Sequence, residues 1–165
     1  MKRYHFIAIG GSAMHSLAIA LKENGDQISG SDDAIFDPSK TQLLKAAIYP
    51  EKMGWHPEKI STDLDAVILG MHAKADNPEL ITAQSLGLKI YSYPEFIAHF
   101  SKRKTRVVIA GSHGKTTISA MVLHVLKYHD RSVDFMLGAQ LDGYNNSVSL
   151  TDKNDFILLE GDEYL

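Results

Sequence analysis

The chain has 165 residues, of which 44% are hydrophobic and 22% charged, a composition typical of a soluble globular protein with one full core or two small ones. Its formal net charge of −3 excludes the broad positive surface that nucleic acid or an anionic membrane would require, so we expect neither as a partner. The absence of cysteine excludes disulfides and thiolate zinc sites.

The N-terminus starts with basic residues and a short apolar run, as a signal peptide does. This run breaks at Gly10-Gly11 after a few residues, and no adequate apolar core or cleavage site follows. No stretch approaches the roughly 20 apolar residues that span a bilayer. We therefore predict a cytoplasmic protein.

The first hundred residues alternate apolar β-type runs with helical patterns. The expected strands cover residues 4–9, 27–31, 66–69 and 89–91, and the expected helices cover 13–24, 38–47, 77–86 and 94–100. Repeated strand and helix units predict an α/β fold with a parallel sheet, helices on both faces, and a ligand at the carboxyl ends of the strands. We predict a Rossmann-like domain over residues 1–100.

The first strand, the turn at Gly10-Gly11 and the following helix have the layout of a dinucleotide-binding unit. Asp32 follows the glycines by about 20 residues, where such an acid meets a ribose hydroxyl. The glycine fingerprint is degraded, because Ala8 and Ala13 stand at two of its three positions. An anion site at the start of the helix is therefore favoured over NAD chemistry. The alternative role for Asp32 is to cap a helix or turn.

A second glycine turn follows a polar, basic stretch at residues 101–105, which we interpret as a solvated linker. Residues 106–117 read RVVIAGSHGKTT: a β-branched run suited to a buried parallel strand, then a glycine-rich turn and a helical pattern. Such a turn points backbone N–H groups and the positive end of a helix dipole at one spot. Lys115 adds a full charge there, and the Thr116 hydroxyl is suited to ligate magnesium. A nucleotide triphosphate is the expected ligand.

This turn departs from the usual P-loop, since Ile109 stands where the pattern has its first glycine. The alternative is a surface turn that happens to contain Gly-Lys-Thr. Its helix is expected over residues 116–128. Four of its side chains are expected to face inward, namely Met121, Val122, Val125 and Leu126.

The end of the chain carries two more apolar runs, at residues 133–137 and 155–159, separated by a loop rich in turn formers. The second run ends in Glu160-Gly161-Asp162-Glu163. Carboxylates at the tip of a strand downstream of a P-loop favour a role in holding magnesium, and the alternative is a solvated acidic tail. Residues 106–165 supply about three strands, too few to cover both faces of a sheet, so we expect a fragment that is inactive alone.

The phosphate loop resembles that of the Mur ligases, the ATP-dependent amide-forming enzymes of peptidoglycan precursor synthesis. IAIGGSAMHSLA, SGSDD, DNPEL, AGSHGKTT and LLEGDEY follow in the order and spacing of that family. The resemblance implies that the first domain binds UDP and not NAD. It implies ATP binding at the loop residues Gly111, Ser112, His113, Gly114, Lys115, Thr116 and Thr117, and magnesium at Thr116 and Glu160. It implies a UDP-sugar site at Gly10, Gly11, Ser12, Ser31, Asp32 and His72.

The similarity is to the UDP-N-acetylmuramate ligase branch of the family. It implies that the sugar's lactyl carboxylate is activated by ATP as an acyl phosphate and joined to an amine, with Lys115 and Thr116 as catalytic residues. The amine is L-alanine or the tripeptide L-alanyl-γ-D-glutamyl-meso-diaminopimelate. Residues 160–164 resemble the E-A-D-E-Y of the tripeptide-adding enzymes and favour the tripeptide, whereas Met14-His15-Ser16 fits neither group. Two other classes remain as alternatives: a nicotinamide-dependent oxidoreductase and a non-catalytic nucleotide-sensing module. No specific protein partner is predicted.

Overall fold

The computed structural model describes residues 1–161, and the chain divides into two compact units, Met1–His99 and Phe100–Leu165. Asp162 and Glu163, two of the acids predicted near magnesium, lie outside the described residues. Both units are α/β, as predicted. No helix within residues 1–161 has the length and apolar character needed to cross a membrane.

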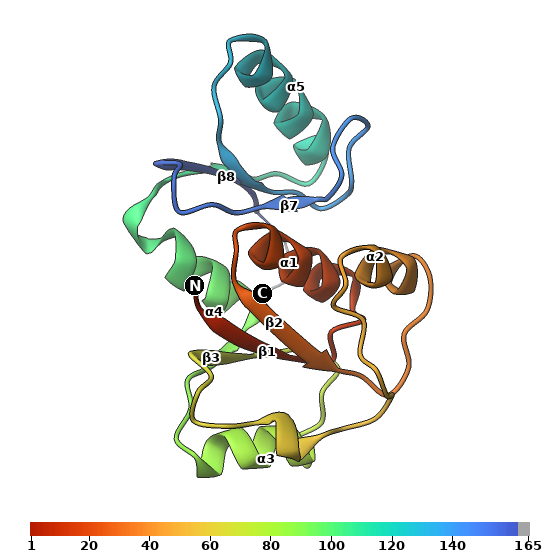
Figure 1. Ribbon diagram of the computed structural model, residues 1–165. Helices are drawn as coiled ribbons and strands as arrows, with labels where there is room; N and C mark the ends of the chain where they lie inside the picture. Colours follow the sequence, from red (N-terminus) through yellow and green to blue (C-terminus); the bar gives the residue numbers. More distant parts are fainter. Residues whose placement is uncertain (162–165) are drawn as a thin grey trace. The chain divides into compact units, whose positions relative to one another are not determined.

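The first unit is built on a parallel sheet with strand order β2-β1-β3-β4 (Figure 1). The strands are β1 (Arg3–Ile7), β2 (Gln27–Ser31), β3 (Ala66–Leu69) and β4 (Ile90–Ser92). The helical segments are α1 (Ser12–Glu23), α2 (Ser39–Lys45), η1 (Pro57–Lys59), α3 (Pro78–Ser85) and α4 (Tyr93–Phe100). Helices α1 and α2 lie on one side of the sheet and α3 on the other (Figure 1). The prediction of helices on both faces is confirmed.

Strand β1 is shorter than predicted, ending at Ile7 where residues up to 9 were expected. The reason is the backbone of Ala8, whose φ of 63° lies in the left-handed region and turns the chain out of the strand. Ile9 is nonetheless fully buried, so the apolar run extends two residues beyond the strand itself. Apolar pattern alone does not separate strand from buried turn.

The DNPEL motif anchors α3 to the sheet. The Asn77 side chain caps the helix by accepting from the backbone N–H groups of Glu79 and Leu80 at 2.9 and 3.2 Å. Glu79, fully buried, lies 3.2 Å from His5 Nε2 on β1 and accepts from the backbone N–H of His56 at 2.6 Å. Burial opposes ionisation of Glu79, but these hydrogen bonds, led by that from His5, hold the pKa of its carboxyl below the ordinary value.

The second unit has a mixed sheet with strand order β5-β8-β6-β7, in which only β7 is antiparallel to its neighbour. Its elements are η2 (Ser101–Arg103), β5 (Thr105–Ile109), α5 (Lys115–Tyr128), β6 (Asp134–Met136), β7 (Val148–Ser149) and β8 (Phe156–Glu160). The strand β7 was not predicted, because two residues are too short to carry a pattern.

Two burial predictions for this unit are wrong. Val107 and Val108 on β5 are 43% and 54% exposed, although the apolar run suggested a buried strand. Within residues 1–161, β5 is an edge strand of its sheet. On α5, Met121 and Val125 are exposed, whereas Val122 and Leu126 are half-buried as expected and Ser119 and Leu123 are the buried residues.

The basic stretch before β5 is not fully solvated, which corrects its interpretation as a solvated linker. Ser101 is fully buried, and its carbonyl accepts from the Lys104 backbone N–H at 3.0 Å and from Arg106 Nε at 3.3 Å. The Lys104 ammonium pairs with the buried Asp134 carboxylate at 2.9 Å. A run of charged residues suggests solvent exposure, but Lys104 of this run forms an ion pair with the buried Asp134, about 30 residues further along the chain.

Candidate functional site

The first unit has a cavity of about 270 Å3 at the carboxyl ends of three adjacent strands. It is lined by the residues that follow β1, β2 and β3: Ala8, Gly10, Gly11, Met14, Asp32, Asp33, Ala34, Gly70, Met71 and His72. Strand β1 connects through α1 to β2 on one side, and β3 pairs with β1 on the other side. Ligands of open parallel sheets bind at such a reversal of strand order.

The glycine turn and Asp32 are joined by a short hydrogen bond. The Gly10 N–H donates to Asp32 Oδ2 at 2.7 Å, and the Ala34 N–H reaches Oδ1 at 3.5 Å. A Cβ at Gly10 would lie 2.9 Å from both Asp32 Oδ2 and Ile35 Cγ1, so the position admits only glycine without rearrangement. Burial raises the pKa of the Asp32 carboxyl, against the lowering effect of the Gly10 N–H. Asp32 thus caps the turn, as the alternative held, and also lines the cavity.

The structure brings together four of the six residues predicted for a UDP-sugar: Gly10, Gly11, Asp32 and His72 all line the cavity. Two do not. Ser12 is the exposed first residue of α1, and its side chain is not part of the lining. Ser31 is fully buried at the end of β2, where its carbonyl accepts from the N–H groups of Ala8 and Ile9 and holds the turn.

Sequence reasoning missed Gly70, which directly follows β3 and lines the cavity. A Cβ there would lie 2.9 Å from the Cβ of Ala8, so the two turns approach closely only because residue 70 is glycine. Its N–H donates to the carbonyl of Ile7 at 2.9 Å and continues the pairing of β1 with β3. A glycine directly after a buried strand was the available signal.

In the second unit the phosphate-type loop forms the link between β5 and α5. Gly111 and Gly114 have φ values of 148° and 76°, which side chains with a Cβ rarely adopt, and Gly114 is the N-cap of α5. The Lys115 ammonium folds back over the loop and donates to the carbonyl of Gly111 at 2.6 Å. Ser112, His113 and Thr117 are exposed around it. The strand, glycine turn and helix predicted here are confirmed.

Glu160, at the end of β8, reaches the first turn of α5. Its Oε2 accepts from the Thr116 hydroxyl at 3.1 Å and from the Gly138 N–H at 2.9 Å. Its Oε1 is buried and has no hydrogen-bond partner among residues 1–161. A carboxylate with one oxygen held by two donors and the other left over is a suitable ligand for a hard cation.

Gly138 is a second residue that sequence reasoning missed. It follows β6, and a Cβ there would lie 2.9 Å from Glu160 Oε2, the distance at which its N–H now donates. Among the described residues no group of three or more His, Cys, Asp or Glu side chains is close enough to hold a metal.

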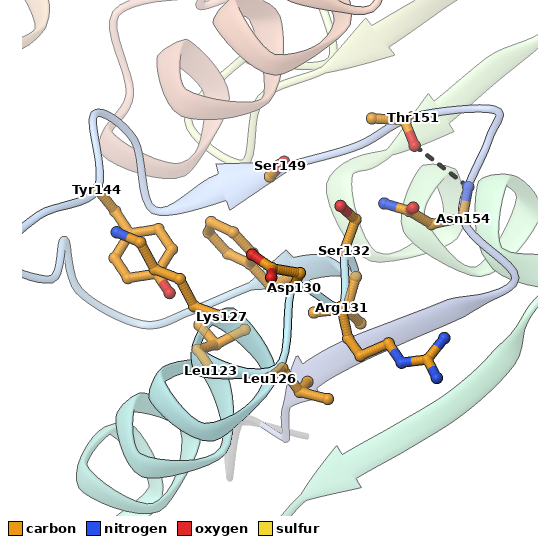
Figure 2. Close-up of a pocket in the computed structure, with 12 residues that line it drawn as sticks. Leu123, Leu126, Lys127, Asp130, Arg131, Ser132, Tyr144, Ser149, Thr151 and Asn154 are labelled. Atoms are coloured by element: carbon orange, nitrogen blue, oxygen red, sulfur yellow. Dashed lines mark hydrogen bonds between the residues drawn. The ribbon is translucent and has the colours of Figure 1, made fainter.

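The second unit has a hollow of about 420 Å3 beside the C-terminal half of α5 (Figure 2). Its apolar lining includes Leu123 and Phe135, and charged side chains such as Lys127 and Arg131 also border it. Lys127 Nζ lies 5.4 Å from the centre of the Tyr144 ring, and Figure 2 shows it pointing toward that ring. None of the residues predicted to bind ATP or magnesium lines this hollow.

Known proteins similar to this chain match it over both units. Residues 3–105 match the Mur ligase family, catalytic domain. Proteins named UDP-N-acetylmuramate--L-alanine ligase from Clostridium acetobutylicum and Carboxydothermus hydrogenoformans are 36% and 32% identical to the chain over 99% of its length. The chain spans about a third of those relatives, 35% and 34% of their lengths.

Solved structures give the same picture. The UDP-N-acetylmuramate:L-alanyl-gamma-D-glutamyl-meso-diaminopimelate ligase from Neisseria meningitides is 29% identical with a TM-score of 0.82, the match covering 99% of this chain and 53% of that one. The UDP-N-acetylmuramate-alanine ligase from Thermotoga maritima is 27% identical with a TM-score of 0.78, covering 97% of this chain and 37% of that one. From the match over residues 3–105, the two glycine turns and these likenesses, we conclude that the chain belongs to the Mur ligase family.

Proposed function

We propose that the chain is the N-terminal part of an ATP-dependent ligase that joins the lactyl carboxylate of UDP-N-acetylmuramate to an amine in peptidoglycan synthesis or recycling. The observation that carries the proposal is the contact of Thr116 and Gly138 with Oε2 of Glu160, which leaves Oε1 buried and unpartnered within residues 1–161. An oxidoreductase built on the first unit gives no reason for this arrangement. Use of ATP supports a cytoplasmic location.

The two units have separate roles in this proposal. Residues 1–100 bind the UDP-sugar, with Gly10, Gly11, Asp32 and His72 lining the cavity. Residues 101–105 connect the two domains, and residues 106–165 form the beginning of the ATP-binding domain. The first-turn N–H groups of α1 suit a diphosphate, because helix N-termini leave these donors without intrahelical partners.

In the second unit, Gly111 to Thr117 surround the phosphates and Lys115 adds a charge. The ammonium of Lys115 now donates to Gly111 O, so a phosphate oxygen would compete with that carbonyl for it. Thr116 and Glu160 Oε1 are the protein groups that fit magnesium. When bound, ATP and magnesium would supply the γ-phosphoryl group that activates the carboxylate as an acyl phosphate and the charge that offsets its repulsion from the carboxylate.

Two amines have support. The sequence at residues 160–164 favours the tripeptide L-alanyl-γ-D-glutamyl-meso-diaminopimelate, although residues 162–164 lie outside the described part of the chain. The names of the relatives from Clostridium and Carboxydothermus favour L-alanine. We propose the tripeptide, with L-alanine as the second candidate. Assay of the full-length protein with each amine decides between them.

Calorimetric titration of the 165-residue chain with UDP-N-acetylmuramate, with NADH as the control ligand, tests the first unit. We expect binding of the UDP-sugar alone, and binding of NADH alone would contradict the proposal. In the full-length protein, Lys115→Ala should abolish turnover and leave UDP-sugar binding nearly intact. A full-length protein that binds ATP but joins neither amine would be a nucleotide-sensing module instead.

A further inference from the structure

A buried histidine that takes no part in the proposed chemistry lies directly behind the glycine turn of the first unit. His15, in the first turn of α1, is 4% exposed. Its Nδ1 lies 3.0 Å from the carbonyl oxygen of Gly11 and 3.0 Å from Ser39 Oγ. Its Nε2 lies 3.2 Å from Gln42 Oε1, so the ring spans from α1 to α2.

A carbonyl oxygen can only accept, so the contact of His15 Nδ1 with the Gly11 carbonyl is a hydrogen bond when Nδ1 carries the proton. In that state a neutral ring accepts at Nε2 from the Gln42 side-chain amide, and a charged ring donates at Nε2 to Gln42 Oε1. The opposite tautomer accepts at Nδ1 from the Ser39 hydroxyl and donates at Nε2 to Gln42, and substitution of His15 by Asn or Gln separates the two. The Gly11 carbonyl also accepts the backbone N–H of His15 at 2.9 Å. With the proton on Nδ1, His15 supplies two donors to one peptide oxygen.

Holding the Gly11 carbonyl oxygen in place also sets the direction of the Ser12 N–H. The Gly11 carbonyl and the Ser12 N–H belong to one planar peptide unit and point in opposite directions. With the carbonyl held along α1, the Ser12 N–H points out of the helix N-terminus. Gly11 lines the cavity and is the N-cap of α1, but it has no side chain of its own to hold this peptide in place.

We propose that His15 is a positioning residue, which holds the Gly11–Ser12 peptide so that its N–H is ready for the diphosphate of a nucleotide. The inference rests on the proposed function, since it takes a nucleoside diphosphate as the ligand of the cavity. Ordering a flexible glycine turn before the ligand arrives removes part of the entropic cost of binding. It also gives a role to His15 in the Met14-His15-Ser16 segment.

The test is calorimetric titration of the 165-residue chain with UDP, in the wild type and in His15→Asn, His15→Gln and His15→Phe. The Asn amide places an N–H near the position of Nδ1, whereas the longer Gln amide places one near Nε2. We expect UDP affinity to fall about three- to tenfold in the Phe and Gln variants and to stay within about twofold of wild type in the Asn variant. Thermal unfolding of each variant shows whether affinity merely follows stability.

Equal UDP affinity in all four proteins would overturn the inference. So would an Asn variant as weak as the Gln variant, because the ring would then act only by filling space. If the Phe variant does not fold, the comparison of Asn with Gln still decides. A wild-type chain that does not bind UDP would contradict the proposed function itself, and that result is distinct from wild-type binding that no variant alters.

Discussion

The Lys104 ammonium lies 2.9 Å from the carboxylate of Asp134, and both side chains are shielded from solvent. Lys104 Nζ also donates to the carbonyls of Thr151 and Asn154, while the Asp134 carboxylate accepts from the side chains of the same two residues. The start of β5, the start of β6 and the loop before β8 are therefore tied together by one polar cluster.

Lys104→Ala should destabilise the second unit by about 3 kcal/mol, because it leaves a buried carboxylate without its cation. Urea unfolding followed by circular dichroism measures the loss. Lys102→Ala is the matched control, since Lys102 belongs to the same basic run but is exposed and should change stability by less than about 0.5 kcal/mol. Equal effects of the two substitutions would contradict a structural role for the cluster.

The buried pair of Glu79 with His5 predicts an acid-sensitive first unit. The pKa of Glu79 is lower in the folded chain than its ordinary value, so its contribution to stability is present above that ordinary value and is lost as pH falls through the folded pKa. Glu79→Ala should cost about 3 kcal/mol at neutral pH. The difference in free energy of unfolding between wild type and variant, measured in urea, should narrow as the pH falls from that ordinary value through the folded pKa. A gap independent of pH would show that Glu79 acts only by packing.

Gly138→Ala should lower turnover of the full-length protein about ten- to a hundredfold, since the new Cβ would lie 2.9 Å from Glu160 Oε2 and displace a carboxylate that we propose binds magnesium. UDP-sugar binding should not change, because residue 138 belongs to the other unit. Ala139→Ser, at the neighbouring exposed position, is the control and should retain activity. Full activity of the Gly138→Ala variant would contradict the proposal that Gly138 positions Glu160 for magnesium.

Two alanines stand where the dinucleotide fingerprint has glycine, and the structure predicts opposite results for the same substitution. Ala8 has a φ of 63°, so Ala8→Gly relieves backbone strain and should stabilise the first unit by up to about 1 kcal/mol. Ala13 is helical, so Ala13→Gly should destabilise by up to about 1 kcal/mol. Differential scanning calorimetry compares the two. A melting temperature of the Ala8→Gly variant below that of the wild type would contradict the proposed backbone strain at Ala8.

The order and kind of elements were predictable where the apolar pattern was long and bounded by turn residues. The predicted strands at residues 27–31 and 66–69 agree with β2 and β3 residue for residue, and Asn77 and Gly87 bracket α3 as their capping preferences predict. The glycine turns after β1 and β5 were also predicted, and each lies at the candidate site of its own unit.

The burial of side chains and their pairing over long sequence distances were harder to predict from the sequence. Nothing local in the run 101–105 distinguishes Lys104, whose partner Asp134 lies far along the chain, from its solvated neighbours. Met121 and Val125 are apolar at helical spacing, yet only the face of α5 that carries Ser119 and Leu123 is buried. Which face a helix buries depends on the sheet beneath it, and periodicity alone does not show where that sheet lies. Ser31 was assigned to the UDP-sugar site from the resemblance to the Mur ligases; in the structure it does not line the cavity, and its carbonyl accepts from the N–H groups of Ala8 and Ile9.

The role of DNPEL in the fold affects how this chain is compared with others. Asn77 caps a helix, and Glu79 holds that helix to β1 through His5, so neither side chain faces the cavity at the strand ends. A motif of this kind reports architecture and carries no information about which amine is chosen. Ligases named for L-alanine and for a tripeptide can share it equally. Substrate choice in such proteins has to be sought in residues that touch the amine, and similarity scored over this segment will not discriminate between the two.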